Sequence, residues 1–264
     1  MNPRLAGAHI LVTRPVDQSA QLVQLVRSAG GVPVAFPALE IEPLAQTATA
    51  AVLDDLQQFD LVIFISPNAV RMAMPCILGR GGLTAQAKIA AVGPATAAEL
   101  KKNGVRDIIS PKAGFDSEAL IAELPAMPLR GSRALIVRGQ GGREFLGESL
   151  RSHGAAVDYL ECYRRVKPDR DMRELLAQPY RDSVKACMAT SSSIVENLFE
   201  MAGEAGRAWL CGLPFFVSHP RVAATAFSRG VQTVFVAGNG DEALVAGALT
   251  WFAQLRLPVA LHEL

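Results

Sequence analysis

Eight short and nearly continuous apolar segments recur along the chain, and this pattern constrains its fold more than any other feature. They are rich in β-branched residues and do not alternate with polar ones, as strands buried on both faces should look. We expect each to form a strand of a parallel sheet. The segments are 9–14, 61–66, 87–92, 106–110, 133–138, 184–190, 213–218 and 232–237.

Longer amphipathic stretches stand between most of these segments. Residues 17–29 begin at Asp17, a good helix N-cap, and place Leu22, Leu25 and Val26 on one face before Gly30 ends the pattern. Alternating strands and helices predict an α/β fold in which helices cover both faces of parallel sheets. The other predicted helices are 68–78, 94–103, 116–124, 142–153, 192–202, 220–229 and 240–254.

The two halves of the chain repeat each other. VGPATAAELKKNGV (92–105) matches VSHPRVAATAFSRGV (217–231), and ISPNAV (65–70) matches TSSSIV (190–195). Downstream, DSEALIAEL (116–124) matches GDEALVAGAL (240–249), while LVTRP (11–15) parallels IVRGQ (136–140). Two copies are too few for a solenoid, so we predict two similar domains built on one α/β unit.

Two further segments fit neither a helix nor a buried strand. AFPALEIEPL (35–44) and VDYLECYRRVKP (157–168) alternate apolar and polar residues, and they occupy equivalent places in the two repeats. Half-exposed extended connectors between domains are the simplest interpretation. If both segments cross between the domains, one domain is discontinuous.

Composition excludes several classes of protein. Half of the residues are apolar, which is too many for a disordered chain. The 26 Lys and Arg nearly balance the 25 Asp and Glu, which argues against a nucleic-acid binder. No apolar run reaches the length of about 20 residues that a membrane-spanning helix needs, and no signal-peptide pattern is present.

The four cysteines are far apart and form no C-x-x-C motif. We expect Cys76, Cys162, Cys187 and Cys211 to be buried free thiols in a reducing cytoplasm, and we expect no zinc site.

The turns that follow the predicted strands are rich in hydroxyl groups, glycine and free helix N-terminal amides, which suit anions at the ligand-binding edge of a parallel sheet. An alternative is that Ser, Thr and Asp there only cap helices.

GNGDEA (238–243) and GQGGRE (139–144) lack the remainder of a dinucleotide fingerprint. The turns are 66–68, 93–96, 111–117, 138–144, 190–193, 218–221 and 237–241.

Four side chains at these positions can carry chemistry. Arg14 and Arg138 end equivalent strands, where they would either bind ligand carboxylates or form ion pairs within the protein. His219 would either touch a ligand or cap a helix. Tyr163 stands in the second connector, where its phenol would either donate a proton or hold the connector by packing.

Taken together, eight motifs resemble those of the uroporphyrinogen-III synthase family over nearly the whole chain. They are VTRP (12–15), FPALEIEP (36–43), FISPNAV (64–70), VGPATAAEL (92–100), SEALI (117–121), ECYRR (161–165), TSSSIVENL (190–198) and VSHPRVA (217–223). The resemblance implies two similar α/β domains, each a parallel sheet with helices on both faces, joined by a two-stranded antiparallel β-ladder. One domain would comprise 1–36 plus 168–264 and the other 39–160, with 35–44 and 157–168 as connecting strands.

The resemblance also implies a reaction. Hydroxymethylbilane, a linear tetrapyrrole with eight carboxylates, would lose water and close with its ring D inverted, as a hydro-lyase of haem and sirohaem biosynthesis requires. Neither cofactor nor metal is expected. We expect a cytoplasmic monomer that contacts the preceding bilane-forming enzyme transiently, and no nucleic-acid or membrane partner.

Site residues follow from the same resemblance. Tyr163 is implied as the proton donor to the departing hydroxyl. Some family members carry two threonines where this chain has Arg221 and Val222, so Arg221 is expected to bind a carboxylate instead. The other expected substrate contacts are Thr13, Arg14, Ser66, Asn68, Thr96, Arg138, Gly139, Thr190, Ser191 and Ser192.

Two other functions remain open from the residues alone. A two-lobed binding protein could clamp a small anionic ligand with the same turns. A nucleotide-dependent transferase could use the glycine-rich turns.

Overall fold

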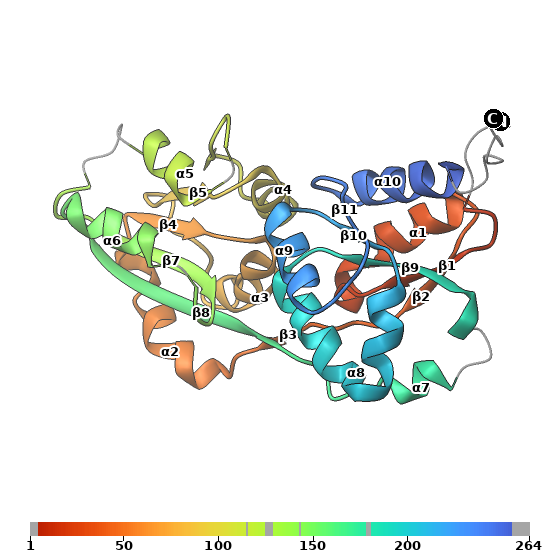
Figure 1. Cartoon of the computed structure of the whole chain (residues 1–264). Helices are drawn as coiled ribbons and strands as arrows, with labels where there is room; N and C mark the ends of the chain where they lie inside the picture. Colours follow the sequence, from red (N-terminus) through yellow and green to blue (C-terminus); the bar gives the residue numbers. More distant parts are fainter. Residues whose placement is uncertain (1–4, 115, 125–128, 143, 178–180, 255–264) are drawn as a thin grey trace, which may run out of the picture. The chain divides into compact units, whose positions relative to one another are not determined.

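A computed structural model describes residues 5–114, 116–124, 129–142, 144–177 and 181–254 of the chain. The chain divides into two compact units (Figure 1). Unit 1 comprises Met1–Glu40 and Val166–Leu264, and unit 2 comprises Ile41–Arg165.

Unit 1 is built on a five-stranded sheet in the order β11-β10-β9-β1-β2, and every neighbouring pair is parallel. Its strands are β1 (His9–Val12), β2 (Val32–Ala35), β9 (Val184–Ala189), β10 (Phe215–Val217) and β11 (Val234–Val236). Its helices are η1 (Val16–Gln18), α1 (Ala20–Ser28), α7 (Arg173–Leu176), η3 (Arg181–Ser183), α8 (Ser192–Gly212), α9 (Pro220–Ser228) and α10 (Asp241–Gln254).

Both faces of this sheet are buried. Leu11 packs into a core with residues of α8 and α9, whereas Ile10 and Val12 pack into a second core with residues of α1 and α10. Figure 1 shows α1 and α10 side by side over one face. Helices on both faces explain why the strand segments are continuously apolar, as predicted.

Unit 2 is built on a six-stranded sheet in the order β3-β8-β7-β4-β5-β6. The pairs β8–β7, β7–β4, β4–β5 and β5–β6 are parallel. The strands are β3 (Glu40–Pro43), β4 (Leu61–Phe64), β5 (Lys88–Ala91), β6 (Ile108–Ile109), β7 (Arg133–Gly139) and β8 (Ala156–Val166). The helices are α2 (Gln46–Asp54), η2 (Leu56–Gln58), α3 (Pro67–Leu78), α4 (Pro94–Lys102), α5 (Ser117–Glu123) and α6 (Phe145–Ser152).

The two sheets share one topology in a different chain order. The strand order β2-β1-β9-β10-β11 of unit 1 corresponds to β8-β7-β4-β5-β6 of unit 2. The register agrees as well, because Val12 pairs with Ala35 and Met188 in unit 1 while Ile136 pairs with Tyr159 and Ile63 in unit 2. The predicted duplication of one α/β unit is therefore present.

The segment 157–168, expected as a half-exposed extended connector, begins inside the sheet of unit 2. Residues of β8 pair with β7 from Ala156 to Tyr163, and Leu160, Cys162 and Tyr163 are buried. Its polar residues are compatible with a place in the sheet because they have charged partners there. Asp158 and Glu161 each bind an arginine of β7. The antiparallel β-ladder between the domains remains a prediction.

Four other elements differ from the prediction. Strand β2 was missed because it contains Pro33, which is tolerated at the edge of a sheet, and helices α2 and α7 were also missed. The helix expected at 192–202 continues as α8 to Gly212 across a kink at Gly203. Gly203 has a φ of 56°, which stops the first segment where the pattern predicted an end.

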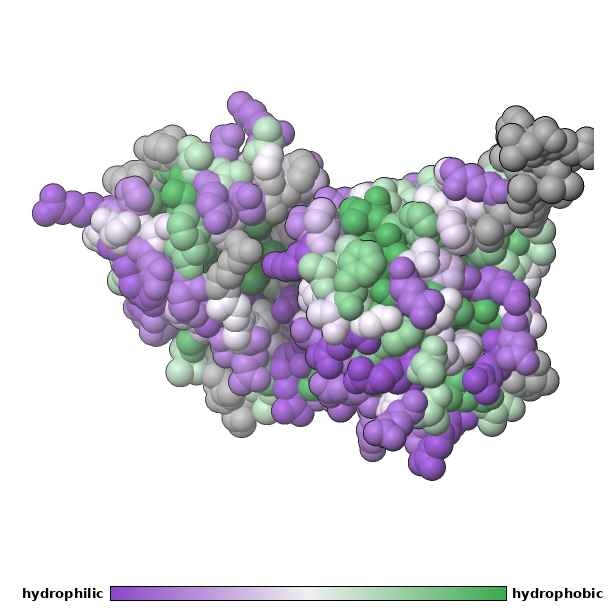
Figure 2. All heavy atoms as spheres, in the orientation of Figure 1, coloured by the Kyte–Doolittle hydropathy of each residue, from purple (hydrophilic) through white to green (hydrophobic). Residues whose placement is uncertain are grey.

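The surface of the protein carries both polar and apolar side chains, and its four thiols differ in burial. On the face shown in Figure 2, hydrophilic side chains are interspersed with apolar ones, some of which adjoin one another. Cys162 and Cys187 are buried free thiols as predicted, but Cys76 and Cys211 are only partly buried. Within the described ranges, no helix has the length and apolarity to cross a bilayer.

Candidate functional site

Each sheet reverses its strand order at one point, and the predicted site residues gather there. In unit 1 the reversal lies between β1 and β9, and in unit 2 between β7 and β4. Ligands of open α/β sheets bind outside the carboxyl ends of strands at this point. Thr13, Arg14 and Thr190–Ser192 follow β1 and β9, whereas Arg138, Gly139 and Ser66 lie at the ends of β7 and β4.

Tyr163 of β8 lies against the reversal point of unit 2. Its phenolic oxygen is 3.1 Å from Ser66 Oγ, a distance at which either hydroxyl can donate. Arg165 donates from Nη2 to the same phenolic oxygen over 3.4 Å, and its guanidinium carbon lies 5.7 Å from the ring centroid. The Tyr163 side chain is only 1% exposed. The phenol is therefore a buried group with two polar partners.

The Tyr163 ring is held in place by the backbone of β7. Gly139 lies so close to the ring that an added Cβ would stand 2.5 Å from both Cε2 and Cζ. On the next residue, Gln140 N–H donates to the Tyr163 carbonyl over 2.7 Å. Gly139 is thus required by close approach, and its predicted substrate contact would have to be made by its backbone.

Arg138 lies at the carboxyl end of β7 and is saturated by groups of the protein. Its Nη1 is 2.8 Å from Glu144, its Nη2 is 3.0 Å from Glu161, and its guanidinium carbon is 3.9 Å from the centroid of the Tyr159 ring. Tyr159 Oη also donates to Glu144 over 2.7 Å. The internal ion pair, one of the two interpretations left open by the sequence, describes Arg138 in this structure.

The charges of this cluster perturb one another. The pKa of Glu144 lies below its usual range because Tyr159 and Arg138 donate to its carboxylate. Burial and the bond to Glu144 raise the pKa of Tyr159. Burial acts on Arg138 in the opposite sense to its carboxylate partners, and the net effect is a raised pKa that keeps the guanidinium charged.

Arg14, the counterpart of Arg138 in unit 1, has a single acidic partner among the contacts described. Its Nη1 forms an ion pair with Asp241 at the start of α10. The Asp241 side chain is 7% exposed, and burial raises the pKa of its carboxyl although Arg14 opposes the shift. Arg14 itself is 26% exposed, so it can reach a ligand more readily than Arg138.

The hydroxyl-rich turns do cap helices, as the alternative interpretation held. Ser66 Oγ accepts from Ala69 N–H at the start of α3, and Ser191 Oγ accepts from Ile194 N–H at the start of α8. His219 caps α9, since its Nδ1 accepts from Arg221 N–H. Capping does not exclude ligand contact, because a serine hydroxyl still has a proton to donate.

The other predicted contacts divide into buried and accessible residues. Thr13 is fully buried and donates to the Met188 carbonyl over 2.7 Å, and Thr96 is buried in the first turn of α4. Ser192 accepts from Thr225 and stays partly exposed, as does Thr190.

Two predicted residues lie further out. Asn68 is partly buried and accepts from Arg71 over 3.2 Å, and Arg221 is exposed in the first turn of α9.

A cavity of about 320 Å³ opens beside Arg138 in unit 2. Arg138, Tyr159, Asp116 and Ser117 form its polar wall, and Ile65, Ile136 and Leu146 form much of its apolar wall. It lies on the face of the sheet covered by α5 and α6. Because Arg138 already carries two carboxylates, the polar wall is not a ready anion site.

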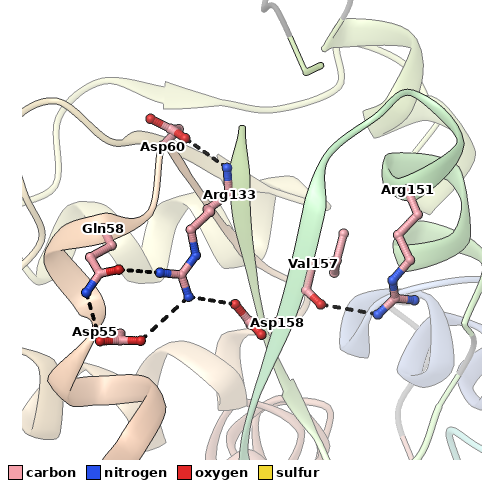
Figure 3. A network of polar contacts seen from close by, with 7 residues as sticks. All are labelled: Asp55, Gln58, Asp60, Arg133, Arg151, Val157 and Asp158. Carbon is pink, nitrogen blue, oxygen red and sulfur yellow. Dashed lines mark hydrogen bonds and ion pairs between the residues drawn. The ribbon is translucent and has the colours of Figure 1, made fainter. Parts of the chain in front are cut away.

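A second polar network lies at the opposite end of β7 (Figure 3). The backbone N–H of Arg133 donates to Asp60 over 2.8 Å, and its guanidinium binds Asp158 at 3.1 Å and Asp55 at 3.6 Å. Gln58 accepts from the same guanidinium. Because this network is at the amino ends of the strands, we assign it to stability rather than to ligand binding.

Sequence reasoning missed the acidic partners of both arginines, namely Glu144, Glu161 and Asp241. The cross-strand pairing of Arg138 with Glu161 would have been the signal, but it depends on a register that the sequence does not give. In the part of the chain that the structure describes, no group of three or more His, Cys, Asp or Glu residues is placed to hold a metal ion.

Comparison with known proteins places the chain in one family. Residues 20–246 match the family model described as uroporphyrinogen-III synthase HemD. The uroporphyrinogen-III synthase of Salmonella typhimurium is 34% identical over 91% of this chain and 99% of its own. That of Escherichia coli is 32% identical over the same shares.

Solved structures give the same fold. A mutant uroporphyrinogen III synthase from Thermus thermophilus superposes with a TM-score of 0.62 at 20% identity, covering 94% of this chain and 100% of that one. A uroporphyrinogen-III synthetase from Helicobacter pylori gives 0.58 at 14% identity, covering 92% and 99%.

Proposed function

The chain belongs to the uroporphyrinogen-III synthase family, and on that premise we propose that it closes hydroxymethylbilane to uroporphyrinogen III. The reaction is a hydro-lyase step: the hydroxymethyl group of ring A leaves as water, and ring D is inverted before the macrocycle closes. The observation that supports it best in the structure is a buried phenol, Tyr163, hydrogen-bonded to a capping serine at the reversal point of a parallel sheet.

Departure of the hydroxyl group needs a proton. Tyr163 is the group we propose as its source, because a phenol can donate and its position is fixed by Gly139 and Ser66. Loss of water leaves an azafulvenium cation on the former ring A carbon. Arg165, within 3.4 Å of the phenolic oxygen, would stabilise the negative charge left on Tyr163.

Choice of the isomer is a matter of geometry. The bilane is reactive enough to close unaided, but to the wrong isomer, so the protein must present the substituted carbon of ring D to the cation. Proximity and orientation can supply this without a strong acid or base.

The eight carboxylates of the bilane need many moderate contacts. Helix N-terminal amides and the accessible hydroxyls of Ser66, Thr190, Ser191 and Ser192 would provide them, with Arg14 and Arg221 as charged partners. We also propose that the chain acts as a cytoplasmic monomer and receives bilane from the preceding enzyme.

One assay decides the proposal. The purified chain is given freshly formed hydroxymethylbilane, and the oxidised products are separated into type I and type III isomers. We expect the type III isomer in proportion to enzyme, with no cofactor or metal added. Only type I, formed at the rate seen without protein, would refute the proposed function.

A further inference from the structure

We propose that the Ser66 hydroxyl, and not the Tyr163 phenol, donates the proton directly to the substrate, and that Tyr163 then donates its own proton to Ser66. This inference rests on the proposed function and refines the route of its proton. It starts from a conflict between chemistry and access: the phenol is the proposed proton source, yet its side chain is 1% exposed. Ser66, its hydrogen-bond partner, is partly exposed.

The donors and acceptors around the pair define a direction. Arg165 has only N–H donors, so the phenolic oxygen accepts from it. Of the two directions open to the contact with Ser66 Oγ, 3.1 Å away, the proposed relay uses the one in which the phenol donates. Ser66 Oγ already accepts from Ala69 N–H over 3.1 Å. In that direction both acceptor positions of the serine are filled, and its own proton is left for donation outward.

The position of Ser66 favours this role. It is the N-cap of α3 and stands directly after β4, at the carboxyl edge where ligands of such sheets bind. Two hydrogen bonds hold its Oγ in place, one with the phenolic oxygen of Tyr163 and one with the amide of Ala69. A hydroxyl held in this way is aligned before substrate arrives, which is what orientation requires of a donor.

The transfer balances. The hydroxymethyl oxygen takes the proton of Ser66 Oγ, the carbon–oxygen bond breaks with its electron pair on oxygen, and water leaves. The proton of Tyr163 moves to Ser66 Oγ, so the serine is restored and the negative charge rests on the phenolic oxygen beside Arg165. Tyr163 regains a proton when closure of the macrocycle restores aromaticity to the pyrrole ring and releases one.

Four variants separate the relay from mere capping. Ser66→Ala removes both the cap and the hydroxyl, Ser66→Asn keeps the cap but has no transferable hydroxyl proton, and Ser66→Thr keeps both. Ser132→Ala, which removes a buried serine hydroxyl at the amino end of β7, away from the ligand-binding edge, is the control for loss of a hydroxyl alone. Turnover number, KM and Tm are measured for each.

We expect kcat to fall about 10–100-fold in Ser66→Ala and in Ser66→Asn, with Ser66→Thr restored to within about threefold of the parent chain. Ser132→Ala should lower Tm and leave kcat unchanged. Normal kcat in Ser66→Asn, or no rescue by threonine in a folded protein, would overturn the relay.

A double-mutant cycle with Tyr163→Phe completes the test. If both hydroxyls serve one proton, the double variant Ser66→Ala, Tyr163→Phe loses no more than about the larger single loss. Losses that multiply would show that Tyr163 acts on substrate independently, and the relay would fall while the synthase function stands. A parent chain that makes no type III isomer would instead remove the proposed function itself.

Discussion

The two units share a sheet topology and most of its details, but among the described residues only unit 2 pairs the capping serine at its reversal point with a phenol. Both have a capping serine there, Ser191 in unit 1 and Ser66 in unit 2. The segment that follows β2, the strand equivalent to β8, consists of Phe36, Pro37, Ala38 and Leu39, none of which has a hydroxyl group. Leu39 is buried in the core of unit 1 and has no proton to offer.

This difference separates substrate binding, which both units can contribute to, from the proposed proton transfer, which only one unit carries. Helix N-termini and hydroxyls recur in both units, so binding groups are present twice. In the described part of the chain a phenol stands beside the capping serine only in unit 2, so we assign the proposed proton chemistry to that unit. The same division holds for the arginines, since Arg138 is saturated by Glu144 and Glu161 whereas Arg14 remains partly exposed.

The largest expected effect comes from a single methyl group that would displace the phenol. In Gly139→Ala the new Cβ would stand 2.5 Å from the Tyr163 ring, so the ring must move. A shift of about 1 Å can cost about 100-fold in rate, and overpacking should cost about 1–3 kcal/mol of stability. We expect kcat and Tm both to fall.

Gly212→Ala is the matched control for the glycine substitution. No atom lies within 4 Å of its added Cβ, so activity and Tm should stay close to those of the parent chain. Full activity in Gly139→Ala would mean that the placement of the phenol is unimportant.

The alternation of strands and helices was predictable because a parallel sheet buried on both faces needs continuous apolar strands. Segments that depart from this rule were not: β8 carries Asp158 and Glu161, and β2 contains Pro33. Their assignment depends on partners far away in the chain, on Arg133 and Arg138 for β8 and on an edge position for β2. A local pattern does not contain that information.

The two arginines at opposite ends of β7 offer a sharper contrast. Arg138→Met leaves Glu144 and Glu161 without their cation in a half-buried place, and we expect a loss of about 1–2 kcal/mol of unfolding free energy together with reduced turnover. Arg133→Met removes a network at the far edge, so we expect about 0.5–1 kcal/mol and unchanged turnover. Denaturant unfolding and the isomer assay measure both. Equal losses of activity would contradict the division between edges.

A smaller effect concerns acid stability. The pKa of Glu144 is lowered in the folded state, so the unfolded chain binds more protons than the folded one below about pH 5. The ionised Glu144 therefore stabilises the fold at neutral pH. This stabilisation is lost as the pH falls through the folded-state pKa. Glu144→Gln should therefore lose less stability between pH 7 and pH 4 than the parent chain. Glu148→Gln, on an exposed position of the same helix, is the control and should behave like the parent.

The site was predictable in its residue types but not in its contacts. The sequence placed Ser66 and Arg138 near sheet edges, because they end apolar runs, and it placed Tyr163 in a connector between the domains. It could not show that Ser66 meets Tyr163, since 97 residues separate them and only the pairing of β8 beside β7 brings them together. Nor could it show that the Thr13 hydroxyl donates its hydrogen bond to the backbone carbonyl of Met188.

The two capping serines provide the most direct test of the division between units. Ser66→Ala and Ser191→Ala remove the same hydroxyl and the same kind of cap from equivalent positions. Steady-state kinetics on hydroxymethylbilane should show a fall in kcat of about 10–100-fold for Ser66→Ala, and mainly a rise in KM for Ser191→Ala. Equal falls in kcat for the two variants would contradict the account.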